Sequence, residues 1–188
     1  GMVRIVKDGV IKAELPAMPL SEASPVYHRP MAAPADLEAR QSFDPGSLPE
    51  LDAEDAAAWI ERLAAHPNVA DKKWVYQQYD HMVRLGTVVP PGGDGALVRL
   101  PNGKGLAVTA DCNPSYCWLD PWMGGAMAVA EGARNVACVG ARPRAITDCM
   151  NFGNPEHPEV MWQFSEAVDG ITEATKALDC PVVSGNVS

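Results

Sequence analysis

Two polar segments in the C-terminal third of the chain carry residue types suited to a phosphate or a metal ion. The first begins at Asp148, and the second runs from Gly185 to Ser188. Carboxylate and amide oxygens, as at Asp148 and Asn186, are hard ligands for Mg²⁺. Gly185 lets backbone approach a phosphate closely, and Ser188 can donate a hydrogen bond to a phosphate oxygen. From spacing alone the simpler interpretation is favoured, in which Asp148 forms a turn and Gly185 adopts a positive φ.

A third candidate lies upstream, where Asp111 and Asp120 flank a loop before a predicted helix. Two carboxylates at this spacing could hold a metal ion beside the amide donors of a helix N-terminus. For Asp120 we prefer a structural role, as the N-cap of a helix whose first residue is Pro121. Both interpretations stay open for Asp111. Cys112 and Cys149 have no neighbouring His or cation to lower a thiol pKa, so structural thiols are favoured over nucleophiles.

The elements that must position these residues alternate between helix and strand patterns. Short strands over 145–147 and from 181 onward deliver Asp148 and Gly185, and such strand ends are the usual ligand position in open α/β sheets. Helix and strand periods along the rest of the chain predict an α/β (α+β) fold. The further elements are strands on both sides of the turn 7–9, helices over 51–65 and 71–85, a hairpin over 96–110 with Asn-Gly in its turn, and helices over 121–139 and 160–178.

The prolines divide the chain. Seven of them lie between Pro16 and Pro49, where no sustained hydrophobic period exists. Because each proline fixes φ and biases its predecessor away from helix, we predict an extended linker there. At the other end, a strand that delivers a Ser-Gly-Asn loop is an unusual place for a chain to stop. We therefore expect the chain to be truncated at its C-terminal end.

Composition excludes several function classes. The chain has 188 residues, with 15 Lys and Arg against 24 Asp and Glu, a formal net charge of −9. Without a basic cluster, broad binding to nucleic acid is disfavoured. No apolar run reaches the ~20 residues of a membrane span, and the start lacks the apolar core of a secretory signal. Five cysteines without a C-x-x-C pair indicate reduced thiols, so we expect a cytoplasmic protein without membrane contact.

The residues from position 120 onward carry a more specific signal than composition and hydrophobic periodicity do. They read DPWMGGAMAVAEGARNVACVGARPRAITDCMNFGNPEHPEVMWQFSEAVDGI and later PVVSGNVS. The run resembles the second half of the large synthetase subunit of phosphoribosylformylglycinamidine synthase, strongly over 70–188. The segments TDCMNFGNPE and PEVMWQF are not shared by generic α/β domains. Residues 9–30 also resemble the junction between the two halves of that family.

The resemblance implies a fold and an activity. The fold is that of an aminoimidazole-ribonucleotide-synthetase N-terminal domain, a mixed sheet with packed helices, over 51–188. A linker over 16–50 and the terminal strand segment of a preceding domain over 1–15 come before it. The activity is a carbon–nitrogen ligation of de novo purine biosynthesis. It converts formylglycinamide ribonucleotide, ATP and glutamine-derived ammonia into formylglycinamidine ribonucleotide, with ATP and Mg²⁺ as cofactors.

The resemblance also assigns residues and partners. Asp148 and Gly185 match ATP contacts, Asn186 a Mg²⁺ ligand and Ser188 a substrate contact. No catalytic residue is assigned, because the stretch 109–114 lacks the Glu and the His residues of the Glu-Ser-His-Asn-His-Pro motif in the family's first half. The implied partners are that first half, the C-terminal domain of the same enzyme, a glutaminase subunit and a small bridging subunit. We therefore expect the chain to be inactive alone.

Two alternative functions, each of a different functional class, stay open for this chain. The chain could be a non-catalytic module that binds a nucleotide or forms a homodimer through its sheet. It could also be another ATP-dependent enzyme of the superfamily, such as a thiamine-phosphate kinase or a selenophosphate synthetase. The MWQF and GNVS runs argue against the second alternative.

Overall fold

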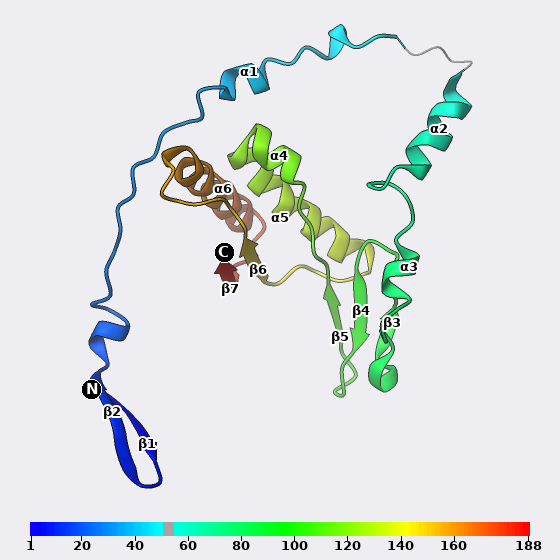
Figure 1. Ribbon diagram of the computed structural model, residues 1–188. Helices are drawn as coiled ribbons and strands as arrows, with labels where there is room; N and C mark the ends of the chain where they lie inside the picture. The colour runs from blue at the N-terminus through cyan, green and yellow to red at the C-terminus, as the bar shows by residue number, and fades with distance from the viewer. Residues whose placement is uncertain (51–54) are drawn as a thin grey trace. The chain divides into compact units, whose positions relative to one another are not determined.

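The first compact unit is a β-hairpin. The structure, a computed structural model, describes residues 1–50 and 55–188 and separates Gly1–Pro30 from Met31–Ser188 (Figure 1). In the first unit, β1 (Met2–Lys7) and β2 (Val10–Pro16) pair in antiparallel fashion and the short 3-10 helix η1 (Met18–Leu20) follows. Asp8 and Gly9 have φ values of 54° and 72°, the left-handed conformation that a two-residue hairpin turn needs. The predicted pair of strands is therefore confirmed.

An antiparallel sheet opens the main part of the second unit. Its strands β3 (Thr87–Val89), β4 (Ala96–Arg99) and β5 (Gly105–Val108) pair in the order β3-β4-β5. The predicted hairpin is confirmed, since Arg99 pairs with Gly105 and Gly103 closes the turn with a φ of 80°. Strand β3 was not predicted from the sequence.

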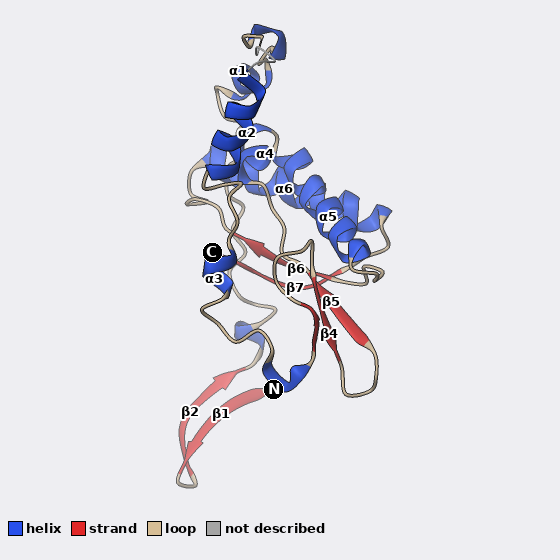
Figure 2. Cartoon of the chain, turned by 90° about the vertical axis from the view of Figure 1, so that its right-hand side faces the viewer, coloured by secondary structure: helices blue, strands red, loops and turns tan. Residues whose placement is uncertain are grey.

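Two long helices, α5 (Pro121–Cys138) and α6 (Pro158–Ala177), pack with their backbones in close contact. A Cβ placed on Gly125 would lie 2.5 Å from the carbonyl oxygen of Ala167, and one on Gly170 would lie 1.9 Å from that of Trp122. Figure 2 shows the two helices side by side. Both helices were predicted, whereas the short helix α4 (Pro114–Leu119) before them was not.

The second sheet is parallel and carries the candidate site. Strand β6 (Ile146–Met150) pairs with β7 (Val182–Val187), and α6 connects them. The sequence placed the end of the first strand at Asp148 and treated the residues after Val183 as a loop, and both expectations are wrong. Ladder hydrogen bonds to the neighbouring strand continue the two strands, and that pairing is invisible in a local pattern. Antiparallel and parallel pairing both occur, in separate sheets, so the α/β (α+β) class is confirmed.

The proline-rich segment contains short helical turns. These are α1 (Leu37–Gln41) and η2 (Pro45–Ser47), where the sequence predicted extended chain. Proline occupies the first position of η2, where its missing N–H costs nothing, and the Asp44 side chain accepts a hydrogen bond from Gly46 N. The domain boundaries at 15 and 50 stay a prediction.

Of the two helices predicted between residues 51 and 85, the structure confirms the described part of one and contradicts the other. Helix α2 (Ala56–Ala65) confirms the described part of the first, whose residues 51–54 lie outside the described range. The prediction of one continuous helix over 71–85 is wrong. Only α3 (Lys73–Tyr76) and η4 (Val83–Leu85) form, with Arg84 at a φ of 58°. The Asp80 carboxylate accepts a hydrogen bond from Met82 N at 2.8 Å, a local bond that competes with the helix.

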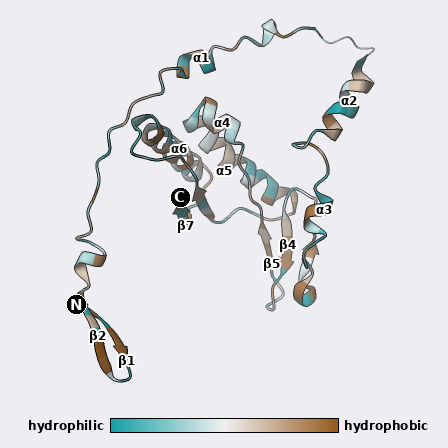
Figure 3. Cartoon of the chain, viewed as in Figure 1, coloured by the Kyte–Doolittle hydropathy of each residue, from teal (hydrophilic) through white to brown (hydrophobic). Residues whose placement is uncertain are grey.

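Few residues are fully buried. The buried apolar side chains, which lie on α5, β6 and α6 and just before β7, are Val129, Met150, Ala167 and Cys180. Large apolar residues remain exposed on the strands, and Figure 3 shows the hydrophobic colour over β1 and β2. Among residues 1–50 and 55–188, no helix combines the length and the apolar character that a membrane crossing requires.

Candidate functional site

Asp148 and Gly185 face each other across the parallel strands. They are register partners of β6 and β7, and Asp148 is half-buried. A Cβ on Gly185 would lie 1.9 Å from Asp148 Oδ1 and 2.5 Å from Asp148 Cγ. The carboxylate therefore occupies the space that any side chain at position 185 would fill. The structure brings these two predicted site residues together.

Asn186 lies on the other face of the same sheet. It pairs with Cys149 in the register, one residue beyond the pair formed by Asp148 and Gly185. Because successive side chains of a strand point to opposite faces, Asn186 and Asp148 do not share a face. The structure therefore separates these two oxygen-bearing side chains.

Ser188 follows the end of β7 and is held by the chain that leaves β6. Its backbone N–H donates to Met150 O at 3.0 Å, and its carbonyl oxygen accepts from Phe152 N at 3.3 Å. Its hydroxyl donates to Asn151 Oδ1 at 2.5 Å. These bonds place Ser188 beside the polar segment that begins at Asp148.

Asn151 is a site residue that the sequence reasoning missed. Besides accepting from Ser188, its amide nitrogen donates to Cys149 O at 3.1 Å and contacts Cys149 Sγ at 3.4 Å. It thus links the ends of both strands. The only available signal was its place in the TDCMNFGNPE run, three residues after Asp148.

The described side chains supply part of a magnesium site at most. Within 1–50 and 55–188, no group of three or more His, Cys, Asp or Glu side chains is arranged to hold a metal ion. Asn186 is exposed and offers one neutral oxygen ligand. Mg²⁺ keeps several waters and takes further oxygens from substrate phosphates, so one protein ligand is compatible with it. Asn186 therefore fits Mg²⁺ as one ligand of a site completed by other groups.

Both carboxylates of the third candidate make hydrogen bonds within the fold. Asp111 accepts from Thr109 Oγ1 at its Oδ2 and from Asn135 Nδ2 at its Oδ1, each at 2.6 Å. Both oxygens are thus engaged in holding the residues after β5 against α5. Asp120 Oδ1 accepts from Met123 N at 2.9 Å and caps α5, which confirms the preferred interpretation.

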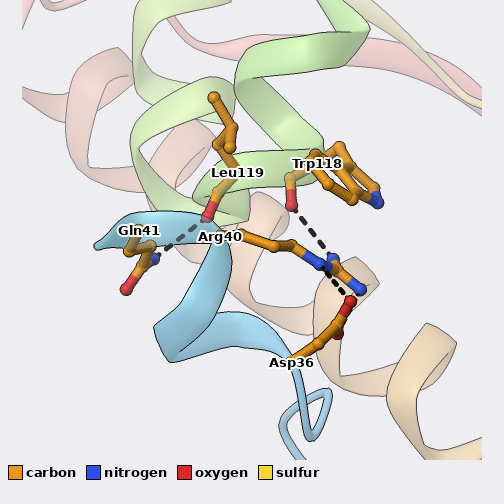
Figure 4. A network of polar contacts seen from close by, with 5 residues as sticks. All are labelled: Asp36, Arg40, Gln41, Trp118 and Leu119. Atoms are coloured by element: carbon orange, nitrogen blue, oxygen red, sulfur yellow. Dashed lines mark hydrogen bonds and ion pairs between the residues drawn. The ribbon is translucent and has the colours of Figure 1, made fainter. Parts of the chain in front are cut away.

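A polar network ties the proline-rich segment to helix α4 (Figure 4). The Arg40 guanidinium lies 4.2 Å from the centre of the Trp118 ring and donates to Trp118 O at 3.3 Å. Its Nε also donates to Asp36 Oδ2 at 2.8 Å, while Gln41 Nε2 donates to Leu119 O at 3.0 Å. The hydrogen bond from Arg40 lowers the pKa of the Asp36 carboxyl. No sequence signal predicted these contacts, which join residues 78 positions apart.

Comparison with known proteins places this geometry in a family context. Two relatives carry the name phosphoribosylformylglycinamidine synthase subunit PurL. The one from Anaeromyxobacter dehalogenans is 54% identical over 186 residues, covering 96% of this chain and 24% of the relative. The one from Moorella thermoacetica is 54% identical over 189 residues, covering 100% and 26%. The chain thus spans about a quarter of the length of these relatives.

Solved structures agree with the sequence relatives. The structure of PurLQS from Thermotoga maritima matches with a TM-score of 0.69 at 27% identity, covering 100% of this chain and 28% of that one. T. maritima PurL complexed with ATP matches with a TM-score of 0.64 at 26% identity, covering 100% and 27%. Residues 92–188 match the family described as AIR synthase related protein, N-terminal domain. Together with the observed α/β architecture, this match shows that the chain belongs to the family of AIR synthase related proteins, as their N-terminal domain.

Proposed function

We propose that this chain is part of a phosphoribosylformylglycinamidine synthase. In that reaction formylglycinamide ribonucleotide, ATP and glutamine-derived ammonia give formylglycinamidine ribonucleotide, a carbon–nitrogen ligation of purine biosynthesis. The observation that carries the proposal is the 54% identity to PurL subunits over nearly the whole chain. The paired positions of Asp148 and Gly185 support it, because the space left by the missing side chain of Gly185 is filled by a carboxylate that can accept hydrogen bonds or hold a cation.

The proposed nucleotide contacts are Asp148 and Gly185. A carboxylate only accepts hydrogen bonds, so Asp148 suits donor groups of the nucleotide or a cation rather than a bare phosphate oxygen. The backbone at Gly185 carries no Cβ, but Asp148 Oδ1 already fills that space. A nucleotide at this pair therefore contacts the carboxylate and the glycine together. T. maritima PurL, which matches this chain, has been solved with ATP, ADP and AMPPCP.

Asn186, on the other face of the strand pair, and Ser188, just after the end of β7, complete the proposal. Asn186 would supply one oxygen to Mg²⁺, and the ion would neutralise charge on the transferred phosphoryl group. Ser188 would contact the formylglycinamide ribonucleotide through its hydroxyl, which now donates to Asn151 and has lone pairs free to accept. T. maritima PurL has also been solved in complex with FGAR.

The proposal also names the partners of this chain and its location in the cell. The chain spans about a quarter of its relatives, so the remaining catalytic machinery would come from the first half and the C-terminal domain of such an enzyme. A glutaminase subunit would supply ammonia and a small bridging subunit would join the assembly, in the cytoplasm. No residue of this chain is assigned a catalytic role, and the chain alone would be inactive.

A chimera tests the proposal directly. The 188 residues replace the matching quarter of the A. dehalogenans PurL subunit, and ADP release is measured with formylglycinamide ribonucleotide, ATP, Mg²⁺ and ammonium. We expect turnover that depends on the ribonucleotide. A chimera that melts like the parent protein but releases no ADP would overturn the proposal. Amidine formation by the 188-residue chain alone would instead contradict its assignment as a non-catalytic part.

A non-catalytic dimerisation module remains the second candidate, favoured by exposed apolar residues on β7. Val183 and Val187 are 64% and 65% exposed. A second copy of the chain could cover this strand. Light scattering at high micromolar concentration tests it, and a monomer throughout would argue against the module.

A further inference from the structure

Asn151 lies opposite Ser188, just beyond the ends of strands β6 and β7. The residues on either side of it hold the backbone of Ser188, since Ser188 N donates to Met150 O at 3.0 Å and Phe152 N donates to Ser188 O at 3.3 Å. These bonds continue the parallel register by one step past the pair of Met150 with Val187. The fold therefore places the side chains of Asn151 and Ser188 next to each other.

The side-chain amide of Asn151 is held in one orientation. Its nitrogen donates to Cys149 O at 3.1 Å and lies 3.4 Å from Cys149 Sγ. A carbonyl oxygen only accepts hydrogen bonds, so turning the amide over would set Asn151 Oδ1 against it, two acceptors without a hydrogen between them. The amide nitrogen therefore faces Cys149, and Asn151 Oδ1 faces Ser188.

This orientation decides what the Ser188 hydroxyl can offer a ligand. A serine hydroxyl has one proton and two lone pairs. Ser188 Oγ donates to Asn151 Oδ1 at 2.5 Å, so its single proton is engaged there. A ligand that approaches Ser188 Oγ then meets lone pairs. A phosphate oxygen is also an acceptor, so it would have to compete with Asn151 for the same proton.

We propose that Asn151 is a positioning residue that fixes the Ser188 hydroxyl as an acceptor and so selects an N–H or O–H donor of the substrate at this point instead of its phosphate. This inference rests on the proposed function, in which Ser188 contacts formylglycinamide ribonucleotide. The donors of that substrate are its ribose hydroxyls and its amide N–H groups. One of these donates to Ser188 Oγ, and the phosphate binds elsewhere. Asn151 acts through Ser188 and not by its own contact with the substrate.

The experiment uses the same chimera of A. dehalogenans PurL, in which Ser188 lies inside a continuous chain. Turnover is measured against the ribonucleotide, with ATP, Mg²⁺ and ammonium saturating. Ser188→Ala should raise the KM for the ribonucleotide about tenfold and Asn151→Ala about threefold, with kcat nearly unchanged, because a bond made equally in the bound substrate and the transition state affects KM alone. Asn102→Ala is the matched control. Its amide oxygen accepts from Lys104 N at 3.1 Å in the hairpin of β4 and β5, so its loss should leave KM unchanged.

The double variant separates positioning from a general loss of structure. If Asn151 acts through Ser188, removing both side chains should raise KM no more than Ser188→Ala does, because the orientation of a missing hydroxyl has no effect. Additive increases in KM would overturn the proposal. An Asn151→Ala chimera with the KM of the unaltered chimera would overturn it as well.

Inorganic phosphate identifies the substrate group at Ser188. Added as a competitor of the ribonucleotide, it should inhibit the Ser188→Ala chimera as strongly as the unaltered one, because the phosphate binds elsewhere. Weaker inhibition of Ser188→Ala would place a phosphate oxygen on the hydroxyl and refute the proposal, even where Asn151→Ala does not fold. A lack of turnover in the unaltered chimera contradicts the proposed function, whereas failure of this inference is seen only between variants.

Discussion

The carboxylate of Asp148 occupies the position where a side chain of Gly185 would otherwise lie. The two residues are register partners in parallel strands, and the hypothetical Cβ is 1.9 Å from Asp148 Oδ1. Only glycine leaves this space, so the residue type at 185 is dictated by the one at 148. Asp148 cannot move to the opposite face, because the strand direction fixes the side to which its side chain points. Substitution of either residue therefore tests this contact directly.

Gly185→Ala is expected to destabilise the chain by about 1–3 kcal/mol, the usual cost of overpacking a fixed site. The added methyl group must displace the Asp148 carboxylate or separate β6 from β7. Urea unfolding of the 188-residue chain measures the change. Gly93→Ala is the matched control, because no heavy atom lies within 4 Å of its Cβ position and its φ is not positive. Equal stability of the two variants would show that the pair is not tightly packed.

Asp148→Asn keeps the shape of the side chain and removes its charge. We expect folding to be retained and ATP-dependent turnover of the chimera to fall by tenfold or more, about 1.4 kcal/mol, since under the proposed function the lost charge would face the nucleotide or its cation. Asp169→Asn, at an exposed position of α6, is the control and should leave turnover unchanged. Full activity of the Asp148→Asn chimera would remove Asp148 from the nucleotide site.

Sequence reasoning succeeded where the signal is local. Apolar residues such as Phe164, Ile171 and Leu178 repeat at helical spacing and predict α6. Likewise, the Asn102-Gly103 turn marks the hairpin of β4 and β5. These patterns depend on residues a few positions apart, so the chain itself contains the whole signal.

The remaining features depend on contacts that no local pattern contains. The predicted helix over 71–85 failed because the Asp80 side chain bonds to the backbone at Met82. The sequence placed the candidate site residues on two strand ends, but their faces follow from the register of β6 with β7, which depends on pairing across more than thirty residues. Hence Asp148 and Gly185 lie on one face of the parallel strand pair and Asn186 lies on the other. Spacing along the sequence alone could not predict this division.

Arg40→Ala is expected to release α1 from α4 without unfolding the rest of the unit. It removes the stacking on Trp118 and the hydrogen bonds to Trp118 O and Asp36, a loss of about 1–2 kcal/mol for a cation–π contact whose Arg40 side chain is only 13% exposed. Amide hydrogen exchange over 37–41 should quicken. Arg62→Ala is the control, because Arg62 stacks on Trp59 within helix α2 and should leave the exchange over 37–41 unchanged.

The same network predicts a response to acid. Because Arg40 lowers the pKa of Asp36 below its ordinary value of 3.8, the bond favours the ionised carboxylate. Its contribution is therefore fully present above pH 3.8 and is lost as the pH falls through the lowered pKa of the folded state. The protection factor over 37–41, which is the exchange rate corrected for the intrinsic effect of pH, should fall below pH 3.8 in the unaltered chain. In Arg40→Ala this additional step should be absent, and its persistence would show that another group titrates.

Gly170→Ala reverses the usual rule for helices. In an ordinary helix interior this change stabilises by about 1 kcal/mol, because alanine has the higher helix propensity. Here the new methyl group would lie 1.9 Å from Trp122 O and 2.7 Å from Trp122 C, rigid backbone atoms of the neighbouring helix. We expect destabilisation of about 1–3 kcal/mol in urea unfolding, since α5 and α6 must move apart. Gly132→Ala in α5 is the comparison, because its nearest neighbour, Asp111 Oδ2, is a side-chain atom at 3.3 Å. A larger loss for Gly132→Ala than for Gly170→Ala would show that backbone contact between the helices does not determine stability.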